Sequence, residues 1–219
     1  MKSHARVVVI GGGVVGVSTL YHLTRKGWSD VVLLERTELT AGSTWHAAGL
    51  LPLFNMSYTV GQLHKYSVDL YKRLPAETGQ DVSFHVTGNL RLATCRDRMD
   101  EYRKYCGTAN TIGVPFQLIS PAEVKELWPL VNLGGDADTP AVIGALYHPD
   151  DGHIAPADLT MALRRAARSA GAEINEQTEV TGAVQMPSGE WKLTTNRGEI
   201  TAEHVVLCTG NYARQTGRM

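Results

Sequence analysis

The stretch Val7–Gly16 reads VVVIGGGVVG, and its pattern indicates how the chain folds. A run of β-branched residues that stops at glycine is typical of a strand buried on both faces of a parallel sheet. Helical spacing continues from Val14 to Lys26 and ends at Gly27, and a second apolar run covers Val31–Leu34. The sequence therefore predicts a β-α-β unit and an α/β fold with a parallel, Rossmann-like sheet.

The glycines between the strand and the helix follow the spacing Gly11-x-Gly13-x-x-Gly16, and Glu35 stands 19 positions after the third of them. Alone, this spacing is a weak signal. Between a strand and a helix, with an acid ending the next strand, it is typical of a dinucleotide-binding loop. The first glycine permits a tight turn, the second lets the backbone approach a pyrophosphate, and the third lets helix and strand pack closely.

The start of the helix is expected to bind an anion, because the amides around Val14 and Val15 point out of its positive end. Glu35 is expected to accept hydrogen bonds from a ribose diol and to repel a 2′-phosphate, even though Arg36 follows it. The alternative is an ordinary strand-to-helix turn beside a solvated acid. The loop by itself does not separate NAD from FAD.

The composition argues against several other function classes. The chain has 219 residues, of which 43% are hydrophobic, and a formal net charge of -1, so no nucleic-acid footprint is indicated. No apolar run is long enough to predict a membrane span. Cys95, Cys106 and Cys208 are odd in number and lack CxxC spacing, so we expect neither a disulfide framework nor a zinc site. A reducing compartment is expected, either the cytoplasm or the mitochondrial matrix of a processed eukaryotic chain.

The first pattern is interrupted and then resumes. We expect a nucleotide-binding domain in residues 1–50 and 154–219, and between them an inserted α+β segment, residues 51–153, that belongs largely to a substrate domain. Helices are expected near 58–74, near 96–110, after an N-cap at Ser120, and from Pro156 to 170. Strands are expected at 82–85, 89–93, 142–147 and 172–175. An antiparallel meander is expected at 180–186, 191–195 and 199–201, and a final buried strand at 204–208.

A second stretch rich in small residues follows the first β-α-β unit. Gly42, Ser43 and Thr44 offer amides and hydroxyls to phosphate or ribityl oxygens. Ala47-Ala48-Gly49 lets the main chain pass close to a flat, wide group, which favours a flavin over a nicotinamide. Trp45 is expected to pack beneath this loop.

Four segments resemble, in the same order, those of the dimethylglycine and sarcosine dehydrogenases, which belong to the D-amino-acid-oxidase-like flavoproteins. They are ELTAGSTWHAAGLLP (Glu38–Pro52), GNLRLAT (Gly88–Thr94), GALYHPDDGHIAPADLTMALRRAAR (Gly144–Arg168) and VVLCTGNYAR (Val205–Arg214). The Trp-His segment is the most specific of them. In that family its histidine is bonded to the 8α-methyl carbon of FAD, so the resemblance implies covalent flavin attachment at His46, whose neutral imidazole is a suitable nucleophile.

The resemblance implies oxidative N-demethylation of a small N-methyl amino acid, such as dimethylglycine or sarcosine. A hydride would pass from the N-methyl carbon to the flavin, and the resulting iminium would hydrolyse to formaldehyde or be captured by tetrahydrofolate. An electron-acceptor protein or oxygen would reoxidise the cofactor. We expect the folate region, and the catalytic residues, beyond Met219, because the chain stops nine residues after Gly210 and resembles the N-terminal part of a longer polypeptide.

By the same resemblance, the Val180 main chain would contact the adenine part of FAD, and Thr209 and Gly210 would lie near the pyrophosphate. The full set of expected FAD contacts is Gly11, Gly13, Val14, Val15, Gly16, Glu35, Arg36, Gly42, Ser43, Thr44, Trp45, His46, Ala47, Ala48, Gly49, Leu50, Val180, Thr209, Gly210 and Tyr212.

Three rival hypotheses remain open. One is an amine or amino-acid oxidase with noncovalent FAD and oxygen as acceptor, another is an inactive flavin-binding fragment, and the third is an NAD-dependent dehydrogenase. A metal site at His148, Asp150, Asp151 and His153 is not expected, because Pro149 and Gly152 mark turns and polar residues there serve as helix caps.

The helix that starts at Pro156 is expected to lack a side-chain cap. Ala155 stands where the family usually has Asp, and Asp158 in the first turn compensates in part.

Overall fold

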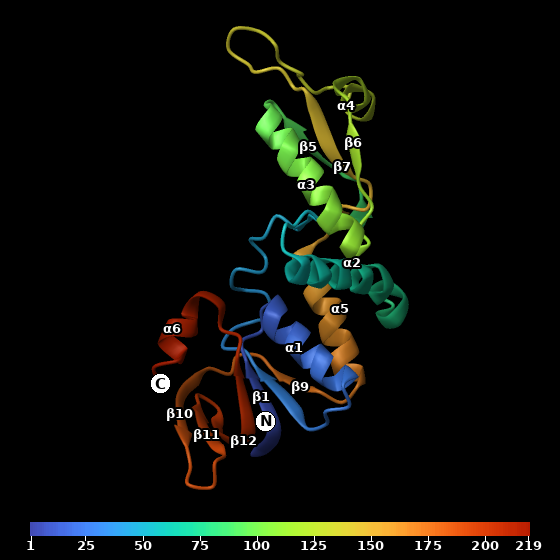
Figure 1. Ribbon diagram of the computed structural model, residues 1–219. Coiled ribbons are helices and arrows are strands. Elements are labelled where there is room, and N and C mark those ends of the chain that lie inside the picture. Colours follow the sequence, from blue (N-terminus) through green and yellow to red (C-terminus); the bar gives the residue numbers. More distant parts are fainter. The chain divides into compact units, whose positions relative to one another are not determined.

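The computed structural model describes Met1–Met219 and divides into two compact units (Figure 1). Unit 1 comprises Met1–Gly49, Arg73–Ser83 and Ala155–Met219, and unit 2 comprises Leu50–Lys72 and Phe84–Ile154. No helix combines the length and the apolar character needed to cross a membrane.

Unit 1 contains a six-stranded sheet in the order β10-β11-β12-β1-β2-β9. β1 pairs in parallel with β2 and β12, β2 pairs in parallel with β9, and β10, β11 and β12 form an antiparallel meander. The predicted parallel sheet with a small meander is confirmed. The strands are β1 (His4–Ile10), β2 (Val31–Leu34), β9 (Glu173–Asn175), β10 (Val180–Gln185), β11 (Trp191–Thr195) and β12 (Gly198–Leu207).

The central strand β1 is buried because both of its faces are covered. Helix α1 (Val14–Arg25) packs against β1, β2 and helix α5 (Pro156–Ser169), and Figure 1 shows the two helices side by side. An apolar cluster lies on the sheet and the meander, and Val8 and Ile10 of β1 belong to it. This double coverage explains the unbroken apolar run in the sequence. The cluster's buried members are Ala5, Val8, Ile10, Val32, Leu34, Val180, Leu193, Ile200 and Ala202.

The last long strand corrects one prediction. The sequence predicts separate strands at 199–201 and 204–208, whereas β12 is continuous. Its first half pairs antiparallel with β11, from Gly198 opposite Thr195 to Ala202 opposite Trp191, and its second half pairs in parallel with β1. The polar pair Glu203-His204 breaks the apolar pattern but not the backbone pairing, and the backbone pairing defines the strand.

Helix boundaries follow local signals in some places and not in others. α4 (Pro121–Leu127) begins with the predicted Ser120 cap, which forms a reciprocal capping box with Glu123. At α5, Ala155 is the N-cap residue and makes no side-chain cap bond, as predicted. α2 (Tyr58–Thr78) is longer than predicted and continues past Pro75. The chain ends in a 3-10 turn (Gly210–Tyr212) and the short α6 (Ala213–Thr216).

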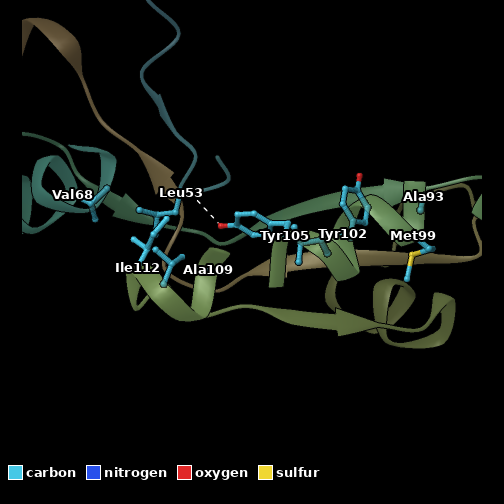
Figure 2. Packing of buried hydrophobic residues seen from close by; sticks show 10 residues of the cluster. Leu53, Val68, Ala93, Met99, Tyr102, Tyr105, Ala109 and Ile112 are labelled. Atoms are coloured by element: carbon cyan, nitrogen blue, oxygen red, sulfur yellow. Dashed lines mark hydrogen bonds between the residues drawn. The ribbon is translucent and has the colours of Figure 1, made fainter. Parts of the chain in front are cut away.

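Unit 2 contains two small antiparallel sheets, in the orders β3-β8-β4 and β5-β7-β6. Helix α3 (Arg96–Ile112) packs on β5 and β7, and Figure 2 shows Tyr102 and Tyr105 of α3 among the buried side chains. The strands are β3 (Leu50–Leu51), β4 (His85–Val86), β5 (Asn89–Ala93), β6 (Gln117–Ile119), β7 (Gly144–His148) and β8 (Gly152–His153).

The strand predicted at 82–85 is wrong over most of its length. Ser83 has a φ of 51°, a left-handed conformation that interrupts an extended strand. Only His85 of that range enters β4, whereas the Val82 carbonyl accepts a hydrogen bond from the amide of Ala155, 3.3 Å away.

Candidate functional site

The glycine loop of unit 1 is held by backbone contacts that leave no room for side chains. Gly11 has a φ of +112°, and a Cβ added there would lie 2.4 Å from the Cys208 carbonyl oxygen at the end of β12. A Cβ on Gly16 would lie 1.9 Å from the Gly11 carbonyl oxygen. The turn and the close helix packing therefore both need glycine, as the sequence analysis expects for these two positions.

Glu35 directly follows β2, and its carboxylate lies beside this loop. Its Oε2 accepts a hydrogen bond from the Gly12 amide at 2.7 Å, and its Oε1 accepts from the amide and hydroxyl of Thr37 at 2.9 and 3.1 Å. The sequence analysis assigns no role to Gly12, yet a Cβ there would lie 2.9 Å from the Glu35 Cβ. The signal was the middle glycine of three in a row, which the spacing motif treats as a free position.

Thr44 bonds the first turn of α1 directly. Its Oγ1 accepts a hydrogen bond from the Val14 amide at 2.9 Å, and the side chain is buried. The sequence analysis expects the Val14 and Val15 amides to face an anion, whereas the structure gives the Val14 amide to Thr44. The N-cap residue, Gly13, has no side chain to cap the helix, so the other first-turn amides keep the orientation usual for an anion site.

The Trp45-His46 pair lies on the surface of the same loop. The two rings lie 3.9 Å apart between centroids, tilted by 37°, and Trp45 is 59% exposed. Trp45 therefore does not pack beneath the loop as the sequence analysis expects. Its ring contact is instead with the neighbouring imidazole of His46.

His46 has two ring nitrogens in different settings. Nδ1 lies 3.0 Å from the Gly42 carbonyl oxygen, and the residue is exposed. In the tautomer that donates from Nδ1 to Gly42, the lone pair is on Nε2. The loop therefore fixes the ring through one nitrogen and leaves the other as an available nucleophile.

The C-terminal end of β12 meets the two loops. The Asn211 side chain donates to the Ser43 Oγ at 3.4 Å, a contact that the sequence analysis missed because the two residues are far apart in the chain. The Arg36 guanidinium lies 4.0 Å over the Tyr212 ring, and its hydrogen bond with Tyr212 raises the pKa of Arg36. Thr209 Oγ1 is buried and has no hydrogen-bond partner within the protein.

The remaining expected contacts are more scattered. Val180 begins β10 with a buried side chain, so only its main chain is available to a ligand. Ala47 and Ala48 are exposed, and Gly49 has a φ of +72°. Leu50 is 68% exposed and belongs to unit 2.

These features fit FAD. The loop accepts no Cβ at Gly11 or Gly16, the Glu35 carboxylate stands beside it, and Thr209 presents an unpartnered hydroxyl at the end of a parallel strand. The same unit also contains His46, whose Nε2 is not used by the contact with Gly42. No group of three or more His, Cys, Asp or Glu side chains is placed to share a metal ion.

Comparison with known proteins gives the same assignment. The family model described as FAD dependent oxidoreductase matches residues 6–219. The chain is 43% identical to rat mitochondrial dimethylglycine dehydrogenase and 39% identical to human mitochondrial sarcosine dehydrogenase, each time over 100% of this chain but only 25% and 24% of the relative. The chain thus spans about a quarter of the length of these relatives.

Among solved structures, L-proline dehydrogenase from P. horikoshii matches with a TM-score of 0.88 and 31% identity, over 98% of this chain and 55% of that one. The matches extend over nearly the whole chain, and the range of the family model spans the glycine loop, Glu35 and the Trp-His segment. The chain belongs to the FAD-dependent oxidoreductase family.

Proposed function

We propose that this chain is the FAD-binding portion of an enzyme that oxidatively N-demethylates a small N-methyl amino acid of the dimethylglycine or sarcosine type. The similarity to dimethylglycine and sarcosine dehydrogenases supports the substrate class. The observation that carries the proposal is the His46 ring, which the Gly42 carbonyl fixes through Nδ1 on an exposed loop of the nucleotide-binding unit. An oxidase with noncovalent FAD needs no histidine held in this way.

In this proposal the first-turn amides of α1 hold the pyrophosphate, and Thr44 keeps that turn fixed through its bond to the Val14 amide. Glu35 exchanges one of its present partners for the ribose hydroxyls. Bound FAD supplies the two-electron acceptor that protein side chains lack. His46 would hold the cofactor through Nε2, the ring nitrogen that the Gly42 contact leaves free, and would supply the nitrogen for a covalent link there.

The substrate class is tested by anaerobic titration of the complete, flavin-loaded protein. Dimethylglycine or sarcosine is expected to bleach the flavin absorbance, and readmission of an electron-acceptor protein or of oxygen is expected to restore it. Glycine, which has no N-methyl group, is the matched control and is expected to leave the spectrum unchanged. Failure of every N-methyl amine to bleach the flavin would contradict the proposed activity.

Covalent attachment is tested separately by acid precipitation. The flavin colour is expected in the pellet of the wild-type protein and in the supernatant of His46→Asn. His64→Asn is the control, because His64 also bonds a backbone carbonyl, that of Pro52 at 3.1 Å, but lies in unit 2. Wild-type colour that stays wholly in the supernatant would support the noncovalent oxidase instead.

A further inference from the structure

A group of polar side chains in unit 2 lies outside the flavin site. Asn89 on β5 stands directly opposite His148 on β7, and Arg91 lies two positions along β5. Residues opposite one another, and residues two apart, share one face of an antiparallel pair. Asp151 follows three residues after His148, in the turn that leads into β8.

These four side chains have buried polar atoms that find no partner within the protein. They are Asn89 Oδ1, Arg91 Nε, both ring nitrogens of His148 and Asp151 Oδ2. His148 is completely buried, and Asp151 is 1% exposed. Each such atom costs about 1–3 kcal/mol when it is left unpaired, so five of them near one place require an explanation.

Three of the four groups, Arg91, His148 and Asp151, contact the apolar core of unit 2. The Leu53 amide donates to Asp151 Oδ1 at 2.8 Å, and the Leu53 carbonyl accepts from the Tyr105 hydroxyl at 3.4 Å, the bond drawn in Figure 2. The Tyr105 ring lies 5.5 Å from the His148 ring. The Arg91 guanidinium lies 4.4 Å over the Phe54 ring, which itself is 4.5 Å from the Tyr105 ring.

Arg91, His148 and Asp151 thus each contact one of Phe54, Tyr105 and Leu53. The Leu53 amide and the Tyr105 hydroxyl already donate to other acceptors, so they do not complete the missing hydrogen bonds. The positive charge of Arg91 acts on both His148 and Asp151, which places all three within electrostatic range of one another.

The mixture of groups identifies the ligand. Arg91 Nε is a donor, the Asp151 and Asn89 oxygens are acceptors, and a neutral His148 ring offers one of each. An anion would meet the Asp151 carboxylate, a cation would meet Arg91, and an apolar molecule would satisfy none of the atoms. Water donates and accepts at once and satisfies all of them.

We propose that Asn89, Arg91, His148 and Asp151 form an internal water-binding site in unit 2. A buried water makes about three hydrogen bonds, so five unpartnered atoms call for about two waters. The waters join β5, β7 and the turn before β8. Asp151 is a positioning residue in this site, because its side chain holds the Leu53 amide and its carbonyl accepts from the amides of Thr87 and Gly88 at 3.2 and 2.8 Å.

A crystal structure of the protein, at a resolution that shows ordered solvent, tests the proposal. We expect water density within hydrogen-bond distance of at least two of the five atoms, with Arg91 Nε and Asp151 Oδ2 joined through water. A direct bond between Arg91 Nε and Asp151 Oδ2, or a site in which the atoms remain unpaired and no water is seen, would overturn it.

A variant provides the second measurement. His148→Phe replaces two polar atoms with a ring of similar shape, and we expect the water nearest that ring to disappear while the one between Arg91 and Asp151 persists. His153→Phe, at an exposed position of β8, is the matched control and is expected to leave both waters in place. If His148→Phe does not fold, long-lived water contacts to the Leu53 amide, measured by NMR on the wild-type protein, decide the question.

Discussion

Thr44 and the glycines of the phosphate loop hold one another in place through contacts that few other residues permit. The Val14 amide has Thr44 Oγ1 as its partner at 2.9 Å, and a Cβ on Gly13 would lie 3.1 Å from the same oxygen. Thr40 in the same segment has a φ of 71°, which is uncommon for a β-branched residue, and its amide donates to the Gly12 carbonyl. Strain of this kind is usual at ligand-binding loops.

Removal of the Thr44 hydroxyl is expected to destabilise unit 1. Thr44→Val keeps the shape but leaves the half-buried Val14 amide without its partner, at a cost of about 1–2 kcal/mol in the free energy of unfolding. Thr44→Ser, which keeps the oxygen, is expected to lose much less. Urea denaturation of the two variants measures the difference, and equal losses would show that the hydrogen bond contributes nothing.

Gly16→Ala is expected to lower the free energy of unfolding by about 1–3 kcal/mol, because the added methyl would meet the Gly11 backbone rather than a movable side chain. FAD content is expected to fall with it. Gly107→Ala, inside α3 with nothing within 4 Å, is the matched control and is expected to gain about 0.5–1 kcal/mol from helix propensity. A Gly16→Ala protein as stable as wild type would refute the close-packing role.

At the scale of elements, α5 is the helix whose start is least supported by its own sequence. Ala155 has the extended conformation of an N-cap residue, with φ -80° and ψ 111°, but offers no side-chain acceptor. Asp158 in the first turn faces the positive end of the helix and accepts from the Ser83 hydroxyl at 3.1 Å. The helix is nevertheless held by its packing against α1.

Ala155→Asp is therefore expected to stabilise the protein by about 0.5–2 kcal/mol, because the backbone already has the conformation that a capping carboxylate needs. Ala155→Asn supplies the same acceptor without charge and separates the hydrogen bond from the helix dipole. Thermal denaturation at low and high salt measures both effects. A melting temperature unchanged in both variants would mean that the first-turn amides of α5 already have partners.

Signals within a few residues predicted many elements well. The cap of α4, strand 89–93 and strand 191–195 depend on neighbouring residues and were predicted with their observed bounds. The continuity of β12 depends on pairing with a strand about 200 residues earlier, which no local pattern contains. In the same way, the bonds from Gly12 to Glu35 and from Asn211 to Ser43 join distant segments, so the sequence identified the glycine loop but not all of its partners.

At the scale of the whole molecule, two ionisable groups in the core of unit 2 make stability depend on pH. Burial raises the pKa of Asp151 to about 6, and the Leu53 amide and Arg91 oppose this rise. Burial lowers the pKa of His148 to about 4, and Arg91 acts in the same direction. Ionisation of the buried Asp151 therefore destabilises the folded protein as the pH rises from about 4 to 6. Protonation of the buried His148 destabilises it as the pH falls from about 6.5 to 4.

Asp151→Asn is expected to remove the first of these dependences. Relative to wild type, the variant's free energy of unfolding is expected to increase by about 2–3 kcal/mol between pH 4 and pH 7, because the wild-type carboxyl must ionise in the core over this range. Asp150→Asn, at the more exposed neighbouring position, is the control and is expected to show a flat difference. Urea denaturation across the pH range checks it, and a flat difference for Asp151→Asn would contradict the raised pKa.

The position of β1 between β2 and β12 has a consequence during synthesis on the ribosome. One neighbour is translated about twenty residues after β1, whereas the other, Gly198–Leu207, is translated much later, after the whole of the intervening chain. Until then this largely apolar strand has one open edge, which is a template for aggregation. Premature termination before β12 is therefore expected to yield insoluble chains, and chaperone dependence should be greatest in that interval.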